Sequence, residues 1–506
     1  MEPTIESSRE ERWLLALYAT LALLSLVPFW TVHYLPTVDG PCHTYNAWVL
    51  AHHGDPRYPL FGQYYKIGAE PYPNWTGHGI LALLMLLAVP PLVAEKILVS
   101  AYALTLLAGA WYLAGSVRPG DRWLALLALP FVFNFLFQFG FYNFSLSLGL
   151  FLFSVGFWWR RRDRPTSPVY VVGINLLLGL CYFSHILSFG LSLLAIAVLW
   201  LATLRRDDWR RHLLHIPVLA PQAFLPLWYL ARGEGSTVAS YWPLGRLVSY
   251  FVSLRVLSPF GGYQDGLAVL LALIFLALLL LTLRREGLRP RWRPEHAFPL
   301  LAAFFILLYF VSPEAMAGGS MLKNRLSLYP WLILIPWLAP GLGPRARRLA
   351  AAALALVALL NLVFVIRWYG RLSGDMAGYL AGLATVEPGS RVLPVSFFHQ
   401  PHDSRLDILG HAMSYAALEK GLIDWDNYEA ASTHFPVQFA DSVPWPPIGD
   451  IEARPGRLRV RQWRQRADYV YTWRMPPQHP FGNRLEQFYQ PVAEADGGVL
   501  WKRLPR

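Results

Sequence analysis

The chain has 506 residues, of which 55% are hydrophobic and only 15% are charged. A soluble domain carries about a quarter of charged residues, so the composition excludes a water-soluble protein and indicates an integral membrane protein. The net charge of +12 lies before Tyr369, because the tail from there onward has equal numbers of basic and acidic residues. The two cysteines, Cys42 and Cys181, allow at most one disulfide and do not indicate a redox compartment.

Apolar runs predict the membrane-spanning segments. The first run is Trp13–Tyr34. The stretch His78–Val117 is broken by Pro90-Pro91, which predicts a half-helix at the outer interface followed by one span. The other predicted spans are Trp123–Phe137, Phe139–Trp159, Val169–Tyr182, Ile186–Leu204, His212–Leu230, Leu267–Leu283, Phe298–Val311, Leu326–Leu338 and Leu349–Ile366. The fold class is therefore an α-helical polytopic membrane protein with about 11 transmembrane helices, or about 13 if His78–Val117 crosses three times.

The distribution of arginine predicts the orientation. Arg-rich clusters lie at residues 160–164, 205–211, 284–293 and 345–348, which are alternate loops of the predicted topology. Cytoplasmic loops carry an excess of Lys and Arg, so we expect these loops and the N-terminus in the cytoplasm and the C-terminal tail outside. The pattern of short clusters between apolar runs is not that of a nucleic-acid-binding protein.

Two domains are predicted. Residues 1–368 form a transmembrane domain with a long first outer loop, residues 35–77, and residues 369–506 form a soluble extracytoplasmic domain. Within this tail we expect strands at Arg391–Phe397, Ala467–Trp473 and Gly498–Arg503, a helix at His411–Lys420 and a Pro-rich loop at Asp441–Pro455. These elements predict a small α/β domain.

The first outer loop holds the candidate catalytic residues. Asp39 follows the first predicted span directly, at the rim of the bilayer, and His43 comes four residues later. One helical turn would bring the two side chains together. An Asp beside a His can remove a proton from an acceptor hydroxyl or amine. The same residue types equally allow Asp39 to be the N-cap of a helix that starts near His43.

Other polar and aromatic residues are candidates for substrate binding because they lie in the first outer loop or at outer ends of spans. They are Tyr64, Tyr65, Lys66, Asn143, His185, Lys323 and Arg325. Aromatic rings can stack on sugars, and an Arg can bind a phosphate through two hydrogen bonds. The same residue types also anchor helices at a membrane interface. The histidines of the loop have no HxxxH or HExxH spacing, so no metal site is predicted.

Together these features resemble the GT-C superfamily, membrane glycosyltransferases that use polyprenyl-phosphate-linked sugars. The resemblance is carried by Asp39 after the first span, the long first outer loop, the segment Pro71–Trp75 before a half-helix, Arg325 with Tyr329-Pro330 opening a late span, and the outer C-terminal domain. It implies that Asp39 is the catalytic carboxylate and that Arg325 contacts the donor phosphate. The chain departs from the acidic pair of metal-dependent members, because Gly40-Pro41 follows Asp39.

The resemblance implies an inverting glycosyltransferase in a bacterial inner membrane. Its partners would be a polyprenyl-phosphate-linked sugar donor, a glycan, lipid or protein acceptor, and membrane lipids. No particular cofactor is implied; a divalent metal stays open as an alternative, although no acidic pair supports it. Two alternatives stay open at this level. One is a non-catalytic GT-C-like subunit that binds lipid or a partner protein, and the other is a lipid flippase or transporter, which would need polar residues at mid-membrane depth.

Overall fold

The computed structural model describes residues 5–204, 207, 209–231, 239–287, 292–315 and 319–505. The chain forms two compact units. The first unit consists of Met1–Pro28, Ser100–Phe137 and Asn143–Val365, and the second unit consists of Phe29–Val99, Gln138–Tyr142 and Ile366–Arg506. The Arg clusters predicted at residues 205–211 and 284–293 lie partly outside the described residues.

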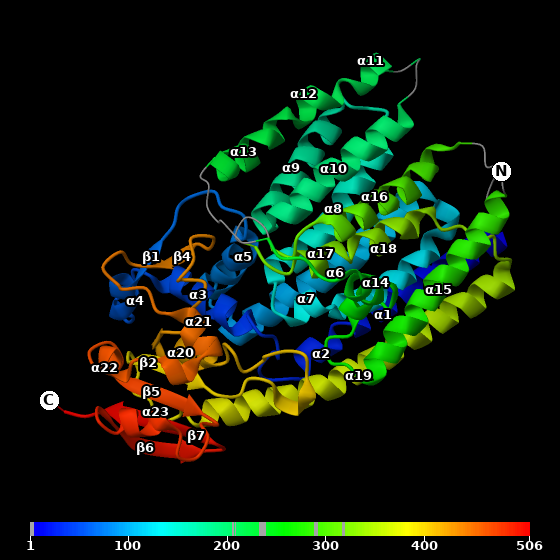
Figure 1. The fold of residues 1–506 in the computed structure, drawn as a ribbon. Coiled ribbons are helices and arrows are strands. Elements are labelled where there is room, and N and C mark those ends of the chain that lie inside the picture. Colours follow the sequence, from blue (N-terminus) through cyan, green and yellow to red (C-terminus); the bar gives the residue numbers. More distant parts are fainter. Residues whose placement is uncertain are drawn as a thin grey trace. The chain divides into compact units, whose positions relative to one another are not determined.

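Most of the described chain is helical (Figure 1). The α-helices are α1 (Ile5–Leu24), α2 (Val27–Trp30), α3 (Gly40–His52), α4 (Pro59–Tyr64), α5 (Trp75–Leu86), α6 (Pro91–Val117), α7 (Phe135–Gln138), α8 (Tyr142–Arg161), α9 (Pro168–Ser184), α10 (Ile186–Thr203), α11 (Trp209–His212), α12 (His215–Leu219), α13 (Phe224–Ala231), α14 (Leu244–Val252), α15 (Tyr263–Glu286), α16 (Ala297–Val311), α17 (Leu322–Leu326), α18 (Tyr329–Leu334), α19 (Pro344–Ala381), α20 (Met413–Lys420), α21 (Ile448–Ala453), α22 (Val460–Trp463) and α23 (Pro480–Leu485). The 3₁₀ helices are η1 (Pro119–Phe133), η2 (Ala220–Ala223), η3 (Arg255–Leu257), η4 (Pro294–His296), η5 (Ile335–Trp337), η6 (Pro401–Asp403) and η7 (Pro455–Arg457).

Seven helical segments of the described chain are long and apolar enough to cross a membrane. They are Glu10–Trp30, Pro91–Val117, Pro119–Gln138, Ile186–Thr203, Tyr263–Glu286, Pro294–Val311 and Pro344–Ala381. Leu273, Leu276 and Leu280 of α15 are about half exposed, as expected for side chains that face lipid rather than water. The protein is therefore an integral membrane protein, while the count of 11 or 13 spans stays a prediction.

Proline explains where the helices depart from the predicted apolar runs. The expected break at Pro90-Pro91 is confirmed, since α5 ends before it and α6 begins at Pro91. The run His212–Leu230 is instead divided into α11, α12, η2 and α13, and the run Leu326–Leu338 into α18 and η5 after the end of α17. Several prolines interrupt these two runs. Each proline removes a backbone donor and its ring clashes with the preceding turn, so a single uninterrupted helix does not form.

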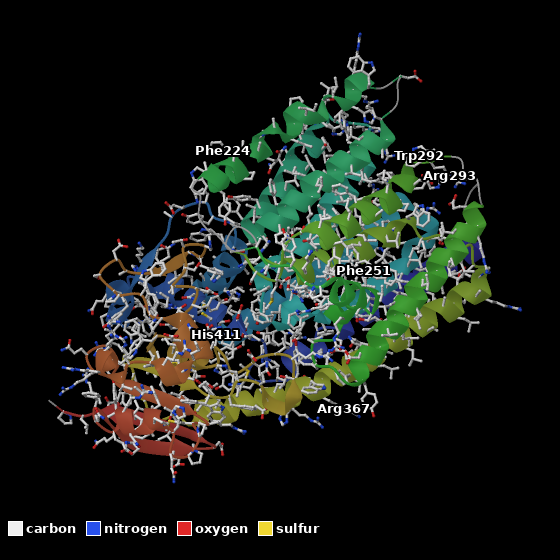
Figure 2. The ribbon with its side chains drawn as sticks, viewed as in Figure 1. Phe224, Phe251, Trp292, Arg293, Arg367 and His411 are labelled. Carbon is white, nitrogen blue, oxygen red and sulfur yellow. The ribbon has the colours of Figure 1, made fainter. Side chains whose placement is uncertain are left out.

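Small residues let helices of the first unit pack closely. A Cβ on Gly149 of α8 would lie 2.7 Å from the backbone nitrogen of Leu106 in α6, so only glycine fits at this crossing. Elsewhere in this unit Phe251, which is labelled in Figure 2, stacks on Trp331 with ring centroids 5.2 Å apart. Tyr329 is fully buried and its hydroxyl lies 2.6 Å from that of Ser188. The buried hydroxyl thus has a partner, as a polar group in such an environment requires.

The second unit contains a five-stranded sheet in the order β3-β2-β5-β7-β6 (Figure 1). Its strands are β2 (Arg391–Ser396), β3 (Ile423–Asp424), β5 (Tyr469–Trp473), β6 (Tyr489–Ala495) and β7 (Gly498–Arg503). β2 pairs in parallel with β3 and β5, whereas β7 pairs antiparallel with β5 and β6. The three predicted strands are confirmed. The helix predicted at His411–Lys420 is confirmed as α20. The prediction of a loop at Asp441–Pro455 is wrong in part, because α21 forms there.

The first outer loop and the tail share one hydrophobic core. β1 (Tyr65–Ile67) of the loop pairs antiparallel with β4 (Val437–Phe439) of the tail. α3 packs against both α5 and α20. The buried Tyr45 of α3 donates a hydrogen bond of 2.6 Å to the carbonyl oxygen of Leu422. The tail is therefore built around the loop that carries Asp39.

The sheet of the second unit is anchored by an ion pair whose loss we expect to measure. Asp468 accepts bonds from the backbone nitrogen, Nε and Nη2 of Arg391 at 3.0, 2.9 and 2.7 Å. Burial raises the pKa of Asp468, but the Arg391 guanidinium outweighs it and holds that pKa below its ordinary value. In Asp468→Asn we expect a loss of about 1 kcal/mol, because the pair is partly exposed.

The measurement is the thermal unfolding of both proteins in detergent across pH. Because the pKa of Asp468 is lowered in the folded state, its ion pair stabilises the fold at pH values above the ordinary pKa of Asp. This stabilisation is lost as the pH falls. The difference between wild type and Asp468→Asn should therefore shrink below about pH 4. The control is Asp441→Asn, since Asp441 pairs with Lys66 but its side chain is 89% exposed. An equally large effect of the control would contradict the expectation.

Candidate functional site

The loop before α3 places Asp39 in the interior. Gly40 and Pro41 open the helix, and Pro41 suits the first turn because its missing N–H has no partner to lose there. The backbone nitrogen of Asp39 donates to the carbonyl oxygen of Phe139 at 3.0 Å. Gly140 has a φ of +97°, and a Cβ there would lie 2.6 Å from the Asp39 nitrogen. Glycine is thus required for the close approach that positions Asp39.

The Asp39 side chain is 4% exposed and makes no capping hydrogen bond to α3. Capping therefore does not explain this carboxylate. Its Oδ1 lies 3.6 Å from Nε2 of His411, and the hydroxyl of Tyr428 hydrogen-bonds to it. Burial raises the pKa of Asp39 to about 6, although His411, His43 and Tyr428 oppose the increase. A carboxylate with a pKa near neutrality, beside an imidazole and a phenol, is suited to accept a proton.

His411 links Asp39 to two further carboxylates of the tail. Its Nδ1 lies 3.6 Å from Asp426, and its Nε2 lies 3.8 Å from Glu452. Burial disfavours the imidazolium, but Asp426, Asp39 and Glu452 outweigh it and raise the pKa of His411 to about 10. His411, labelled in Figure 2, lies two residues before the start of α20. We define Asp39, His411, Asp426, Tyr428 and Glu452 as the Asp39 cluster.

A second group of charged residues surrounds His43 of α3. Glu429 is fully buried and is paired with Nδ1 of His43 and, at 2.8 Å, with Nε2 of His78. Asn46 donates to the same carboxylate at 2.9 Å. Burial raises the pKa of Glu429, but His43 and His78 outweigh it and lower that pKa well below its ordinary value. We define Glu429, His43, His78 and Asn46 as the Glu429 cluster.

The expected turn between Asp39 and His43 is present, since the His43 nitrogen donates to the Asp39 carbonyl at 3.0 Å. The side chain of His43, however, pairs with Glu429 rather than with the Asp39 carboxylate. Beneath this turn lies a third buried acid, Glu95, which accepts bonds of 2.7 Å from the hydroxyls of Tyr142 and Tyr415. All three acids thus have partners within the second unit.

Three residues predicted to bind substrate contact other side chains of the second unit. They are Tyr64, Tyr65 and Lys66. The Tyr64 hydroxyl accepts a bond from Arg391 at 3.2 Å. The Tyr65 hydroxyl lies 3.0 Å from that of Tyr45, and Lys66 pairs with Asp441 at 2.5 Å. Tyr65 is buried and the Lys66 side chain is half exposed. A role of these residues in substrate binding stays a prediction.

The remaining predicted residues belong to the first unit. Nη1 of Arg325 lies 3.1 Å from Nε2 of His185, and its guanidinium lies over the ring of Phe144. Asn143 is buried beside Phe144 at the start of α8. Lys323 is fully buried and donates to the carbonyl oxygen of Tyr309 at 2.5 Å. The structure therefore brings Arg325 and His185 together, whereas Lys323 is held by backbone carbonyls.

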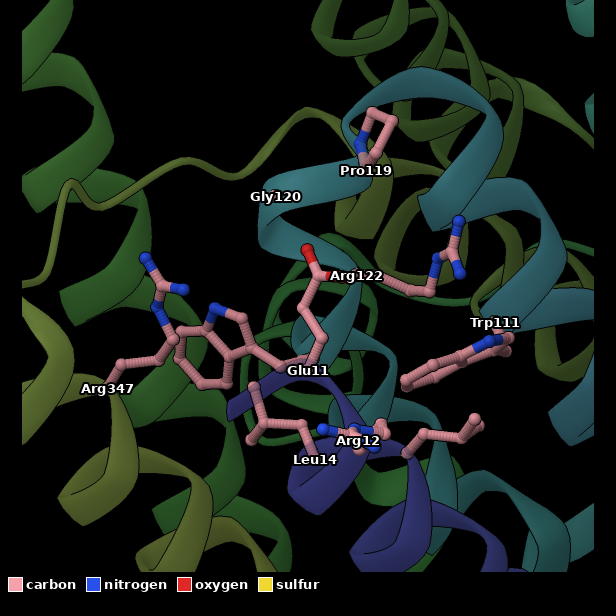
Figure 3. Close-up of a pocket in the computed structure, with 10 residues that line it drawn as sticks. Glu11, Arg12, Leu14, Trp111, Pro119, Gly120, Arg122 and Arg347 are labelled. Carbon is pink, nitrogen blue, oxygen red and sulfur yellow. The ribbon is translucent and has the colours of Figure 1, made fainter. Parts of the chain in front are cut away.

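A pocket of about 350 Å³ also lies in the first unit (Figure 3). Arg12, Arg122 and Arg347 line it together with Glu11 and Trp111. Arg122 lies over the ring of Trp111 at 5.5 Å. No residue of either acidic cluster lines this pocket, so it is separate from the candidate site.

Sequence reasoning missed most partners of Asp39 and His43. Asp426, Tyr428 and Glu429 come from one short segment directly after β3, and His411 comes from the segment before α20. One signal was available. The run Asp424–Glu429 holds three acidic and two aromatic residues just after the apolar pair Leu422-Ile423, and such residues at the end of a strand are often functional.

No known family model matches the chain, and no curated protein sequence matches it either. A solved structure does match. It is ArnT from Cupriavidus metallidurans bound to undecaprenyl phosphate, with a TM-score of 0.53 over 98% of this chain and 99% of that chain, at 14% sequence identity. This chain has the fold of ArnT. The expected architecture, a GT-C-like helical membrane protein with a small C-terminal domain, is thereby confirmed at the level of the fold. At 14% identity the likeness concerns the fold alone.

The close approach of Gly140 to Asp39 leaves no space for a side chain at position 140. In Gly140→Ala the new Cβ would meet backbone atoms of Asp39 and Gly40 at 2.6 and 2.7 Å, and the residue has a positive φ. We expect a destabilisation of about 1–3 kcal/mol, because backbone cannot yield as a flexible side chain does. The measurement is the melting temperature in detergent.

The control is Gly79→Ala in α5, where a Cβ meets nothing within 4 Å. Alanine is the better helix former, so the control should leave the melting temperature unchanged or slightly raised. Wild-type stability of Gly140→Ala would show that the loop does not need glycine at this position.

Proposed function

We propose that the protein transfers a sugar from a polyprenyl-phosphate donor to an acceptor on the extracytoplasmic face of the membrane. The observation that carries the proposal is the buried Asp39 carboxylate, which faces His411 and Tyr428 at the position after the first apolar helix. The GT-C fold supports a lipid-linked donor, since the similar ArnT binds undecaprenyl phosphate. The acceptor is a glycan, lipid or protein with a free hydroxyl or amine.

In this mechanism Asp39 is the general base. It accepts the proton of the acceptor hydroxyl or amine, while the acceptor atom forms a bond to the anomeric carbon of the donor sugar. The bond from that carbon to the phosphate oxygen breaks on the opposite face, and its electron pair leaves with the polyprenyl phosphate. The configuration at the anomeric carbon is therefore inverted. His411 and Tyr428 orient the carboxylate, because both contact it directly.

Arg325 is the proposed contact of the donor phosphate. A guanidinium can donate two parallel hydrogen bonds to phosphate, and it stabilises the negative charge that collects on the leaving group. His185 supports this role, since it lies 3.1 Å from Nη1 and restricts the side chain. The alternation of Arg clusters along the chain supports placing both Arg325 and the tail outside the cytoplasm.

We expect Asp39→Asn to lower transfer by about 10²–10⁴-fold, because the amide keeps the size of the carboxylate but cannot accept the proton. The assay follows release of polyprenyl phosphate from a lipid-linked sugar in nanodiscs with a candidate acceptor. The matched control is Asp55→Asn in the same loop, where Asp55 pairs with Arg57 at 2.6 Å. Turnover near the wild-type rate in Asp39→Asn, in a protein with an unchanged melting temperature, would exclude this mechanism.

We expect Arg325→Ala to weaken binding of polyprenyl phosphate about tenfold or more, since a charge-assisted hydrogen bond contributes roughly 1.5–3 kcal/mol. Binding is measured by titration of the purified protein in nanodiscs with undecaprenyl phosphate. The control is Arg348→Ala, because Arg348 is exposed and belongs to an Arg cluster of the predicted cytoplasmic side. Equal losses in both variants would show that Arg325 only anchors its helix.

A further inference from the structure

The Glu429 cluster unites three metal-ligating side chains that are far apart in the sequence. His43 lies on α3, His78 on α5 and Glu429 in the segment after β3. One donor atom from each lies within 4.8 Å of the others. The three side chains are at most 6% exposed. Two imidazole nitrogens and one carboxylate oxygen form a donor set that suits Zn²⁺.

The hydrogen bonds around the cluster point toward its centre. Nδ1 of His78 lies 3.2 Å from the carbonyl oxygen of Asn74, which can only accept a proton. Nδ1 therefore carries the hydrogen, and in the neutral ring the lone pair of Nε2 faces Glu429. A metal-binding histidine typically donates its other N–H to such a carbonyl, which fixes the tautomer and the direction of the ring.

A second observation concerns Glu429 and His43. Glu429 Oε1 and His43 Nδ1 are in direct contact, so this imidazole also turns a ring nitrogen toward the carboxylate. The other oxygen of the carboxylate is held by Asn46 at 2.9 Å. Each oxygen of the Glu429 carboxylate thus has an imidazole nitrogen against it, and one cation bound by all three side chains would satisfy the same atoms.

We propose that His43, His78 and Glu429 bind one divalent cation of the Zn²⁺ class. The cation would neutralise the buried carboxylate while both imidazoles stay uncharged, and it would join the first outer loop to the tail. Three protein ligands leave a further coordination position for water. This site goes beyond the proposed function, which needs no metal, and it reverses the expectation drawn from the local spacing of histidines.

The first test is the metal content of the full-length protein, purified in detergent through a tag without histidine and without chelator. Inductively coupled plasma mass spectrometry should find about one equivalent of zinc. Protein stripped by chelator should regain about one equivalent of added Co²⁺ and show the visible absorption of cobalt bound by nitrogen and oxygen ligands. Less than a tenth of an equivalent of any divalent metal, with no Co²⁺ spectrum, would overturn the proposal.

Variants locate the ion and distinguish it from other histidines. Glu429→Gln and His78→Gln should lose the bound metal, whereas His402→Gln should keep it, since His402 is half exposed and pairs with Asp375. Adding Zn²⁺ to stripped protein should raise the melting temperature of wild type and of His402→Gln only. Retention of metal in Glu429→Gln together with its loss in His411→Gln would place the ion in the Asp39 cluster and overturn the assignment. If the cluster variants do not fold, the Co²⁺ spectrum and metal content of the wild type decide alone.

Discussion

The second unit depends on the burial of carboxylates. Asp39, Glu95 and Glu429 are each at most 4% exposed. Removing an ionised carboxylate from water costs several kcal/mol unless cations or hydrogen-bond donors replace the lost hydration. Each acid is compensated by groups that belong to other segments of the chain. The segment that carries the partners therefore has to pack on the segment that carries the acids.

This requirement explains why the tail and the first outer loop form one unit. Tyr415 of the tail donates to Glu95, His411 faces Asp39, and Glu429 pairs with two histidines of the loop and of α5. The β1–β4 pairing adds a backbone connection between loop and tail. Asp39 is consequently surrounded by ordered groups, which is the pre-organisation that the proposed role as general base needs.

Sequence reasoning located Asp39 and the helical turn to His43 because both are local features. The distance of four residues predicts a shared turn, and the backbone bond between the two residues confirms it. The partner of the His43 side chain was not predictable in this way. Glu429 follows His43 only after several hundred residues of chain. A spacing rule such as HxxxH applies only when the ligands share one helix. Asp426 and Tyr428 were not predicted as members of the Asp39 cluster for the same reason, although the acidic and aromatic segment that carries them can be seen in the sequence.

The sequence by itself determined the membrane class, the break before α6 and the principal strands of the tail, because hydropathy, proline and alternation act over a few neighbouring residues. It also carried the resemblance to the GT-C superfamily through the order of these elements. Only the tertiary structure decided which buried acid pairs with which histidine, and that Gly140 lies against Asp39. Such pairings depend on the direction of side chains across packed segments, and no local periodicity records where distant segments meet.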